Sequence, residues 1–332
     1  MHIPENYLSP STCAVMTAAM VPVWVNAAKK VKTEISKEKM PLLGIGAAFS
    51  FIGMMFNVPL PGGTTGHAVG GTLIAVLLGP HAACLAVSIA LLIQALLFGD
   101  GGILAFGANC FNMAFLLPYA GYAVYGLLNR KSSSEKGRLA AAALGSYAGI
   151  NAAALAAAIE FGIQPMLFHT ADGQALYCPY GLNVSIPAMM AGHLTLFGLA
   201  EVVFTTAVLA FVTRTSPDIV KGRPTERSGR PMLILLALLI AVVPLGLLAE
   251  GTAWGEWGTD EIAEVVSGGE VLGYTPAGME SGFELSTIMP DYTVAGLPDA
   301  AGYIVSAVIG TAICVIAFRL ISSGMKQKTN YN

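Results

Sequence analysis

The chain has 332 residues, of which 55% are hydrophobic and only 11% are charged, and its formal net charge is −3. With a mean hydropathy of +0.67, this composition excludes an ordinary soluble domain and indicates an integral membrane protein. The apolar runs are too long and too unbroken for the alternating strands of a membrane barrel. The expected fold is therefore an all-α membrane helical bundle.

A hydrocarbon core about 30 Å thick is crossed by a helix of about 20 apolar residues. Residues 68–98 could form one long kinked helix, but a single pass there would place the basic loop NRKSSSEKGR on the opposite side from every other basic loop. Two passes are therefore preferred, and the first of them is short and ends at Gly79-Pro80. The sequence then predicts about nine spans, near residues 10–28, 40–58, 68–79, 80–98, 103–128, 139–160, 185–213, 232–250 and 303–321.

The charged residues are distributed unevenly along the chain. All 17 Lys and Arg residues fall into the four segments 29–39, 130–138, 214–230 and 319–328. By the positive-inside rule these segments are cytoplasmic. Acidic residues concentrate in the segment 250–299, which contains no Lys or Arg. We expect a multi-pass protein of the cytoplasmic (inner) membrane, with its amino terminus outside and its carboxyl terminus inside.

The chain begins MHIPENYLSP, without a signal-like segment, so we expect Met1 to be the mature terminus. The Met1 α-amine, the deprotonated amide nitrogen of His2 and the His2 Nδ1 atom can close one five-membered and one six-membered chelate ring on a single metal ion. The loop PLPGGTTGHAVGG places His67 on the same side of the membrane, where it can fill the fourth in-plane position. Four nitrogens, one of them an anionic amide, favour square-planar Ni(II) or Cu(II) over tetrahedral Zn(II), and nickel fits best. Met1, His2 and His67 are therefore the candidate metal ligands, although each histidine alone would be read as an ordinary polar residue.

Three stretches, MHIPENYLSP, GGTTGHAVGG and LFGDGGILAFGANCFNMA, resemble the CbiM/NikM family. This family provides the substrate-binding membrane subunits of energy-coupling factor transporters for cobalt and nickel. The resemblance covers about residues 1–213 and implies a seven-helix core whose amino terminus folds back into the bundle, with Met1, His2 and His67 as nitrogen ligands. It also implies a transmembrane coupling subunit and cytoplasmic ATPase subunits as partners. Glu5-Asn6 departs from the Asp-Gly that often follows MHIP in the family, which leaves the role of this stretch open.

The chain divides into the metal-binding core 1–213, a basic cytoplasmic linker 214–231 and a two-helix segment 232–332. The last segment contains the acidic outer loop 250–302. This arrangement resembles the small N component found with CbiM or NikM, here fused to the core. The resemblance implies help with metal loading or a contact between subunits, whereas simple charge asymmetry across the membrane would explain the acidic loop equally well.

Three polar residues are candidates for supporting the metal ligands. Asp100 could accept the second ring proton of His67, as carboxylates beside metal-bound histidines often do, although a polar glycine turn explains it more simply. Asn109 and Asn112 lie one turn apart in an apolar span. They could hold the inserted terminus or form interhelical hydrogen bonds, and the second interpretation is preferred.

Other residues carry weaker signals. Glu201 and His193 lie within a predicted span, where an acid is a functional candidate by default because its charged form is costly, although Glu201 could instead be paired or protonated for packing. Neither His81 nor His169 is expected to be a ligand. A stripe of small residues can pack inside the bundle or against a partner; it consists of Ala141, Gly145, Gly149, Ala153 and Ala157. The cysteines are too far apart for a thiolate site; they are Cys13, Cys84, Cys110, Cys178 and Cys314.

No phosphate-binding loop G-x-x-x-x-G-K-[ST] and no hydrolase motif occur in the sequence, so we expect neither ATP binding by this chain nor an enzyme. Its short basic loops do not support nucleic-acid binding. The preferred hypothesis is a substrate-capture subunit of an ATP-driven importer for nickel or cobalt, with nickel favoured. The alternative is a stand-alone secondary transporter for divalent transition-metal ions, driven by protons through Glu201 and His193. Related halves and several midplane charges would be expected for that class, and neither is evident.

Overall fold

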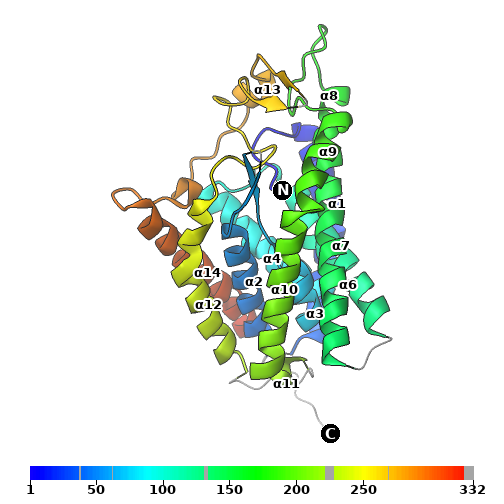
Figure 1. The fold of residues 1–332 in the computed structure, drawn as a ribbon, viewed down its shortest axis with the longest axis vertical. Helices are drawn as coiled ribbons and strands as arrows, with labels where there is room; N and C mark the ends of the chain where they lie inside the picture. Colours follow the sequence, from blue (N-terminus) through cyan, green and yellow to red (C-terminus); the bar gives the residue numbers. More distant parts are fainter. Residues whose placement is uncertain (37–38, 62, 131–133, 221–227, 268, 325–332) are drawn as a thin grey trace.

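The structure is a computed structural model that describes residues 1–332 except 37–38, 62, 131–133, 221–227, 268 and 325–332. Most helices run along the long axis of the molecule and pack as a bundle (Figure 1), which confirms the expected all-α membrane fold. Seven described stretches are long and apolar enough to cross a membrane: Pro10–Glu34, Pro80–Phe98, Phe106–Asn129, Glu135–Leu167, Leu196–Thr215, Arg230–Leu248 and Asp299–Ser323. They correspond to seven of the predicted spans.

The two remaining predicted spans are shorter helices. Helix α2 (Met40–Met55) has 16 residues, nearly all buried, and forms the centre of the bundle. Helix α3 (Gly71–Leu78) has only 8 residues, about 12 Å at 1.5 Å per residue. It follows Gly70 and ends at Gly79, whose φ angles of 72° and 93° suit glycine. The predicted short pass before Pro80 thus has less than half the length of a full crossing.

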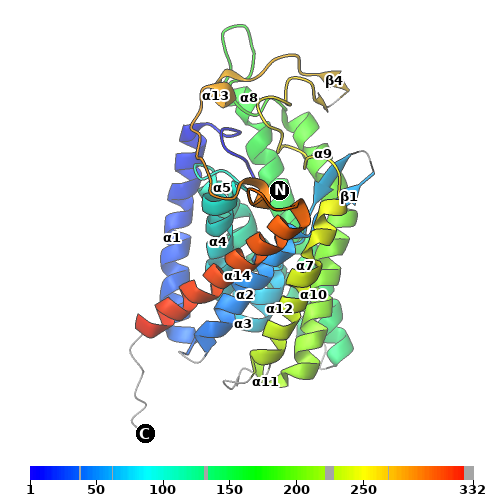
Figure 2. The same ribbon diagram turned by 90° about the vertical axis from the view of Figure 1, so that its left-hand side faces the viewer.

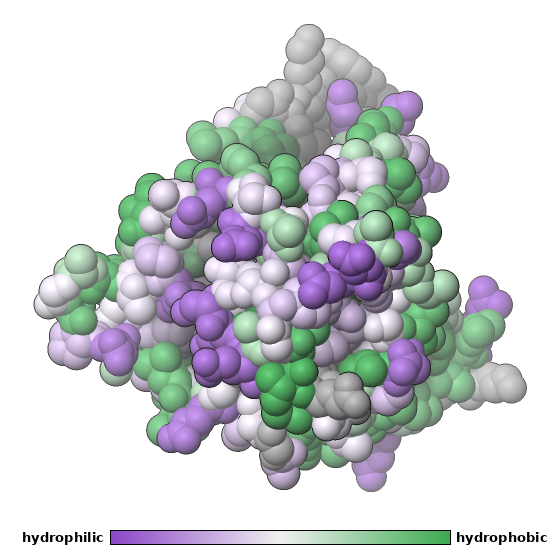
Figure 3. Space-filling model, turned by 90° about the horizontal axis from the view of Figure 1, so that it is seen from above, coloured by the Kyte–Doolittle hydropathy of each residue, from purple (hydrophilic) through white to green (hydrophobic). Residues whose placement is uncertain are grey.

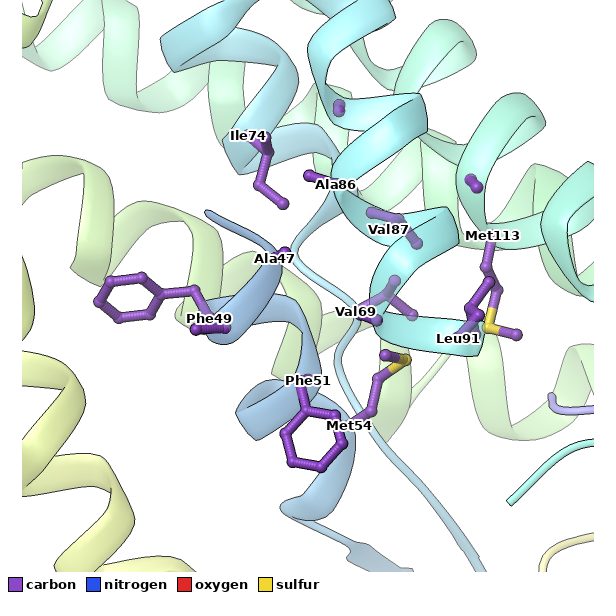
Figure 4. Close-up of a cluster of buried hydrophobic side chains, with 14 of the residues drawn as sticks. Ala47, Phe49, Phe51, Met54, Val69, Ile74, Ala86, Val87, Leu91 and Met113 are labelled. Carbon is purple, nitrogen blue, oxygen red and sulfur yellow. The ribbon is translucent and has the colours of Figure 1, made fainter. Parts of the chain in front are cut away.

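A short hairpin connects α2 to α3. Strands β1 (Val58–Leu60) and β2 (Thr64–Gly66) pair antiparallel, with Val58 opposite Gly66. Residues 67–70 then continue into the bundle as irregular backbone. The side chain of Val69 lies in the core near Met54 of α2 (Figure 4). Irregular backbone at this depth is tolerated because protein surrounds it.

The next group of helices consists of α1, α4, α5 and α6. Helix α1 (Pro10–Glu34) begins at Ser9, whose hydroxyl accepts a hydrogen bond from the Thr12 amide. Helix α4 (Pro80–Ile93) continues as the π-helix η2 (Gln94–Phe98). The next stretch is also irregular: α5 (Phe106–Asn109) passes through the π-helix η3 (Cys110–Leu116) into α6 (Leu117–Asn129).

The predicted stripe of small residues packs within the bundle. It lies on α7 (Glu135–Gly162), which is followed by the short α8 (Gln164–Leu167). A Cβ atom added at Gly145 would lie 2.6 Å from the Gly121 carbonyl oxygen, and one at Gly149 would lie 2.5 Å from the Leu117 carbonyl oxygen. The glycines therefore let α6 and α7 approach closely, which is the first of the two interpretations considered for the stripe.

The predicted span 185–213 is divided into α9 (Leu182–His193) and α10 (Leu196–Thr215). The break lies at Thr195, whose φ of −116° and ψ of −108° are not helical. Beyond it the ring of Phe197 packs directly over Gly192, a contact that a continuous helix would not allow. The short helix α11 (Pro217–Val220) follows α10.

The C-terminal part crosses the bundle and covers its upper end. Helix α14 (Asp299–Gly324) runs diagonally across α2 (Figure 2), and a Cβ added at Gly44 would lie 3.0 Å from the Val315 Cα. Between the two helical stretches the chain forms small elements near the amino terminus. The elements of this part, in order, are α12 (Arg230–Val242), η4 (Val243–Leu248), β3 (Val266–Ser267), β4 (Glu270–Val271), α13 (Ala277–Glu280), η5 (Pro290–Tyr292) and α14.

The two ends of the bundle differ in the chain segments that they carry. The lower end carries the end of α6, the start of α7, α11 and the start of α12, whereas α8 and α13 lie at the upper end (Figure 1). Viewed from above, hydrophilic residues gather across the middle of the molecule and hydrophobic residues lie along much of its rim (Figure 3). The described residues of the basic segments therefore lie at the end of the bundle opposite to the acidic segment (Figures 1 and 2). The direction of the bundle in the membrane stays a prediction.

Candidate metal site

The amino terminus is inserted into the bundle. Figures 1 and 2 place it among the helices, beneath the C-terminal covering segment. Met1 is 4% exposed, His2 is 2% exposed and Ile3 is fully buried. A charged amine and a polar imidazole are costly to bury without partners, so this placement indicates a specific role for the first two residues.

Backbone hydrogen bonds hold the inserted terminus. The Asn109 side chain accepts from the Ile3 amide (2.8 Å) and donates to the Ile3 carbonyl oxygen (3.0 Å), so it pairs with Ile3 as a neighbouring strand would. The Gly102 amide also donates to the Ile3 carbonyl oxygen. Gly101 leaves room for this arrangement, since a Cβ there would lie 3.0 Å from Asn109 Nδ2 and 3.2 Å from the His2 ring.

The two residues that depart from the family pattern anchor the same segment. The Glu5 carboxylate accepts hydrogen bonds from the Ile103 and Leu104 amides, at 2.7 Å and 3.2 Å. Asn6 pairs with the backbone of Phe283, donating at 2.9 Å and accepting at 3.1 Å. Glu5 thus ties the terminus to the core, and Asn6 ties it to the fused C-terminal part.

The two candidate histidine ligands meet at the inserted terminus. The Nδ1 atom of His2 lies 3.2 Å from the Nε2 atom of His67, and their ring centroids are 4.9 Å apart. Two nitrogens in adjacent positions of a planar site, each about 2.0 Å from the metal, would be roughly 2.8 Å apart. The observed separation therefore differs little from that required of two ligands to one ion.

Acidic groups lie on both sides of these nitrogens. Asp100 Oδ1 is 3.2 Å from His2 Nδ1, and Glu256 Oε1 is 3.3 Å from the Met1 amine. A divalent cation bound with one anionic amide nitrogen would keep a single positive charge, which these carboxylates can balance in a buried site. Asp100 was considered as a possible acceptor for the His67 ring, with a polar glycine turn as the preferred explanation, and the structure places its carboxylate against His2.

Burial keeps the imidazoles in the form that binds metal. Desolvation lowers the pKa of His2 to about 4 and outweighs the opposing effect of Glu256. Desolvation, together with the nearby His2, also lowers the pKa of His67 well below its usual value. Both rings are therefore neutral at neutral pH, and a neutral imidazole nitrogen is the ligand that transition metals require.

A hydrogen-bond network links His2 to the C-terminal part. Gln94 Nε2 donates to Asp100 Oδ2 (3.1 Å) and to the Tyr292 hydroxyl (2.8 Å), and that hydroxyl donates to Asp100 Oδ2. Tyr292 comes from η5, so the fused segment helps to fix the carboxylate beside His2. Sequence reasoning did not identify Gln94, Glu256 or Tyr292, since nothing in their local sequence marks them.

The two asparagine candidates have different roles. Asn109 holds the inserted terminus, whereas interhelical hydrogen bonds were the preferred prediction from the sequence. Asn112 lies one turn further along and donates to Glu160 Oε2 at 2.8 Å, so it links η3 to α7. Asn112 therefore forms the interhelical bond that was preferred, and its side-chain amide donates to Glu160 and not to a candidate ligand.

A cavity lies beside the two histidines. A cavity of about 340 Å³ is lined by His2, His67, Asp100, Glu256 and Tyr292, among others. Within the described ranges, no group of three or more His, Cys, Asp or Glu side chains is arranged to hold a metal. A metal here would depend on the terminal amine and amide. The five cysteines are buried and unpaired.

Of the other flagged residues, His81 and His169 have partners elsewhere in the molecule, whereas His193 lines a small pocket together with Met1. His193 Nδ1 lies 2.8 Å from the Met189 carbonyl oxygen, and His81 pairs with Glu34 near the end of α1 at 3.5 Å. His169 lies in the loop after α8, next to Thr170. Glu201 is fully buried and accepts hydrogen bonds from the Val69 and Gly70 amides.

Comparison with known families divides the chain into two matches. Residues 2–219 match CbiM, the cobalt uptake substrate-specific transmembrane region, and residues 230–327 match the PDGLE domain.

Two relatives match over nearly the entire chain. The "Probable fused nickel transport protein LarMN" of Lactiplantibacillus plantarum is 52% identical over 332 residues, covering 99% of each chain. The "Fused nickel transport protein NikMN" of Rhodobacter capsulatus is 46% identical over 344 residues, again covering 99% of each. A solved structure described as a truncated transition metal transporter is 60% identical, with a TM-score of 0.61, and the match covers 64% of this chain and 99% of that one.

Proposed function

Since the chain belongs to the CbiM family and has a nickel-transport-type C-terminal part fused to it, we propose that it captures nickel or cobalt ions at the membrane for uptake. The ion is the transported substrate and not a resident cofactor. Proteins of this family are transporters and not enzymes.

One observation carries the proposal: His2 Nδ1 and His67 Nε2 converge to 3.2 Å at a buried amino terminus. The Met1 amine and the His2 amide nitrogen belong to the same two residues as His2 Nδ1, so they can bind one ion in two chelate rings. Met1, His2 and His67 then supply four nitrogens, while Asp100 and Glu256 balance the charge. Asn109 holds the terminus in place.

Nickel is the favoured ion. An anionic amide and three further nitrogens form a strong planar field, which suits Ni(II) better than most divalent ions. Two relatives named as nickel transport proteins support this choice, whereas the family description names cobalt. Cobalt is therefore the second candidate.

We further propose that import is driven by ATP through separate subunits. The resemblance to energy-coupling factor transporters implies a transmembrane coupling subunit and cytoplasmic ATPases, because this chain has no phosphate-binding loop. The proposed location is the cytoplasmic membrane, with the metal site open to the outside. The proposed domains are the metal-binding core 1–213, the cytoplasmic linker 214–231 and the two-helix segment 232–332.

A proton-driven secondary transporter is the alternative. It would use Glu201 and His193 as proton carriers. The Glu201 oxygens are occupied by backbone amides at 2.7 Å and 2.9 Å, and His193 Nδ1 lies 2.8 Å from a carbonyl oxygen. These contacts favour structural roles for both residues and support the ATP-driven hypothesis.

Calorimetric nickel titration of His67→Ala and His169→Ala tests the proposed ligand set. The first variant should bind at least 10-fold more weakly, as even the loss of a residue that supports a ligand costs 10- to 100-fold. The second should bind as the unmodified protein does, since His169 lies outside the site. Equal affinities for all three would contradict the assignment. Uptake of radioactive nickel that persists after ATP depletion would instead contradict the ATP-driven mechanism.

A further inference from the structure

The buried carboxylate of Glu201 faces the backbone that follows His67. Its Oε2 atom accepts hydrogen bonds from the Val69 amide at 2.7 Å and from the Gly70 amide at 2.9 Å. Its Oε1 atom lies 3.2 Å from the Gly70 amide and 3.5 Å from the Thr205 hydroxyl. A side chain on α10 thus binds two consecutive amides of a distant loop.

These two amides need such a partner because of the local fold. Residues 67–70 lie between the β1–β2 hairpin and α3, so the Val69 and Gly70 amides belong to neither hydrogen-bond pattern, although the Gly70 carbonyl oxygen accepts from the Ile74 amide of α3. Gly70 is the residue before α3 and provides no side-chain cap. Buried amides without acceptors would destabilise the loop by about 1–3 kcal/mol each. Glu201 supplies the missing acceptor from another helix.

Neighbouring residues of α10 support the same loop through packing. A Cβ added at Gly66 would lie 2.7 Å from the Phe197 ring, and one added at Gly70 would lie 2.7 Å from the Phe204 ring. Phe197, Glu201 and Phe204 are spaced by four and three positions, so they share one face of the helix. The side chain of Val69 is fully buried on the other side of the loop.

We propose that Glu201 is a positioning residue that fixes the backbone of residues 67–70 and so aims the His67 ring at His2. This proposal rests on the ligand role given to His67 under the proposed function. Glu201 itself touches neither the metal nor its ligand atoms. What matters is an acceptor atom at the right distance, and a net charge on Glu201 is not required.

Two conservative variants separate these requirements. Glu201→Gln removes the acid but retains an oxygen that can accept both amide hydrogens, as Oε2 does. Glu201→Asp retains the acid but shortens the side chain by one methylene, so its oxygens withdraw from the loop. If Glu201 is a positioning residue, Glu201→Gln should bind nickel with nearly the affinity of the unmodified protein. Glu201→Asp should lose about 10- to 100-fold in affinity, as happens when a residue that supports a metal ligand is disturbed.

The absorption of bound Ni(II) provides a second readout. The d–d bands report the donor set, so Glu201→Asp should shift them toward those of His67→Ala, and Glu201→Gln should leave them unchanged. A double-mutant cycle tests whether the effect passes through His67. Glu201→Asp should cause no further loss of affinity in a protein that already carries His67→Ala.

Two further variants act as controls. Thr206→Val alters a neighbouring α10 residue that bonds only within its own helix, and it should change neither affinity nor spectrum. Phe204→Leu removes support from the same loop at Gly70, so it should produce the same spectral shift even if Glu201→Asp cannot be purified in folded form.

Several results would overturn the inference. One is that Glu201→Asp keeps nickel affinity while Glu201→Gln loses it, and another is that both variants bind nickel as the unmodified protein does. A third is that Glu201→Asp lowers affinity by the same factor in the His67→Ala background, and a fourth is that the spectrum of Phe204→Leu is unshifted. Failure of the proposed function is distinct: His67→Ala itself would then bind nickel as tightly as the unmodified protein. If His67→Ala weakens binding and Glu201→Asp does not, only the positioning role is lost.

Discussion

His2 Nδ1 lies 3.2 Å from His67 Nε2, although the two residues are 65 positions apart. His2 reaches this point because the amino terminus folds inward, and His67 reaches it because irregular backbone enters the bundle ahead of the short helix α3. Neither residue lies on a long helix. The proposed metal site is therefore built from two segments whose conformation depends on the residues packed around them.

Asn109→Ala should weaken nickel binding by about 10-fold or more, in the range found when residues that support ligands are lost. The change removes both hydrogen bonds to Ile3, at 2.8 Å and 3.0 Å, and releases the inserted terminus. Calorimetric titration measures the effect. Asn112→Ala is the matched control. It removes the hydrogen-bond donor to the Glu160 carboxyl and should lower the stability of the protein, but nickel affinity should be unchanged. Equal losses of affinity in the two variants would contradict a specific role for Asn109.

Tyr292→Phe tests whether the fused C-terminal part supports the site. The hydroxyl bonds to Asp100 and Gln94, so its removal frees the carboxylate beside His2 and should lower nickel affinity by about 10-fold. Tyr303→Phe serves as the comparison, because Tyr303 lines the same cavity but donates to the Met55 carbonyl oxygen. Competition titration against a nickel indicator would show the difference. Indistinguishable affinities for the two variants would mean that the fused part does not act through Tyr292.

Purified protein offered equal concentrations of Ni(II) and Co(II) should retain mainly nickel. The reason is the planar field of four nitrogens, one of them anionic, which Ni(II) accepts more readily. Elemental analysis after removal of free metal measures the ratio. A preparation in which cobalt predominates would reverse the preference and would point to additional donors outside the plane.

Single cysteines should report the orientation of the bundle. Lys136→Cys at the start of α7 should resist an impermeant thiol reagent in intact cells, whereas Asp172→Cys in the loop after α8 should react. The native cysteines are buried, so their background labelling should be low. Labelling at position 136 but not at 172 would place the amino terminus in the cytoplasm and would invalidate the proposed direction of capture.

Much of the fold could be predicted because long apolar runs and the positions of Lys and Arg are local properties of a membrane protein. Even the short pass before Gly79-Pro80 followed from the requirement that basic loops share one side. The break between α9 and α10 could not be predicted in this way. It depends on the packing of Phe197 over Gly192, a tertiary contact without a signal in hydropathy.

The proposed ligands could be identified because the amine, amide and imidazole of Met1 and His2 are adjacent in the sequence. Their supporting residues are remote: Glu256 is 255 positions from Met1, and Tyr292 is 192 positions from Asp100. The position of Asp100 beside His2 could not be predicted for the same reason, as only the folded chain brings the terminus next to this carboxylate. Glu201 was recognised as unusual, but its contacts with Val69 and Gly70 required the structure.

Acetylation of the Met1 amine tests the central claim most directly. The acetyl group removes the amine as a donor and breaks the five-membered ring that the amine would close with the His2 amide nitrogen, while it leaves His2, His67 and the helices unchanged. Calorimetry should then show nickel affinity reduced at least 10-fold, together with altered d–d absorption of any nickel still bound. Unchanged affinity and an unchanged spectrum would contradict a metal site built on the amino terminus.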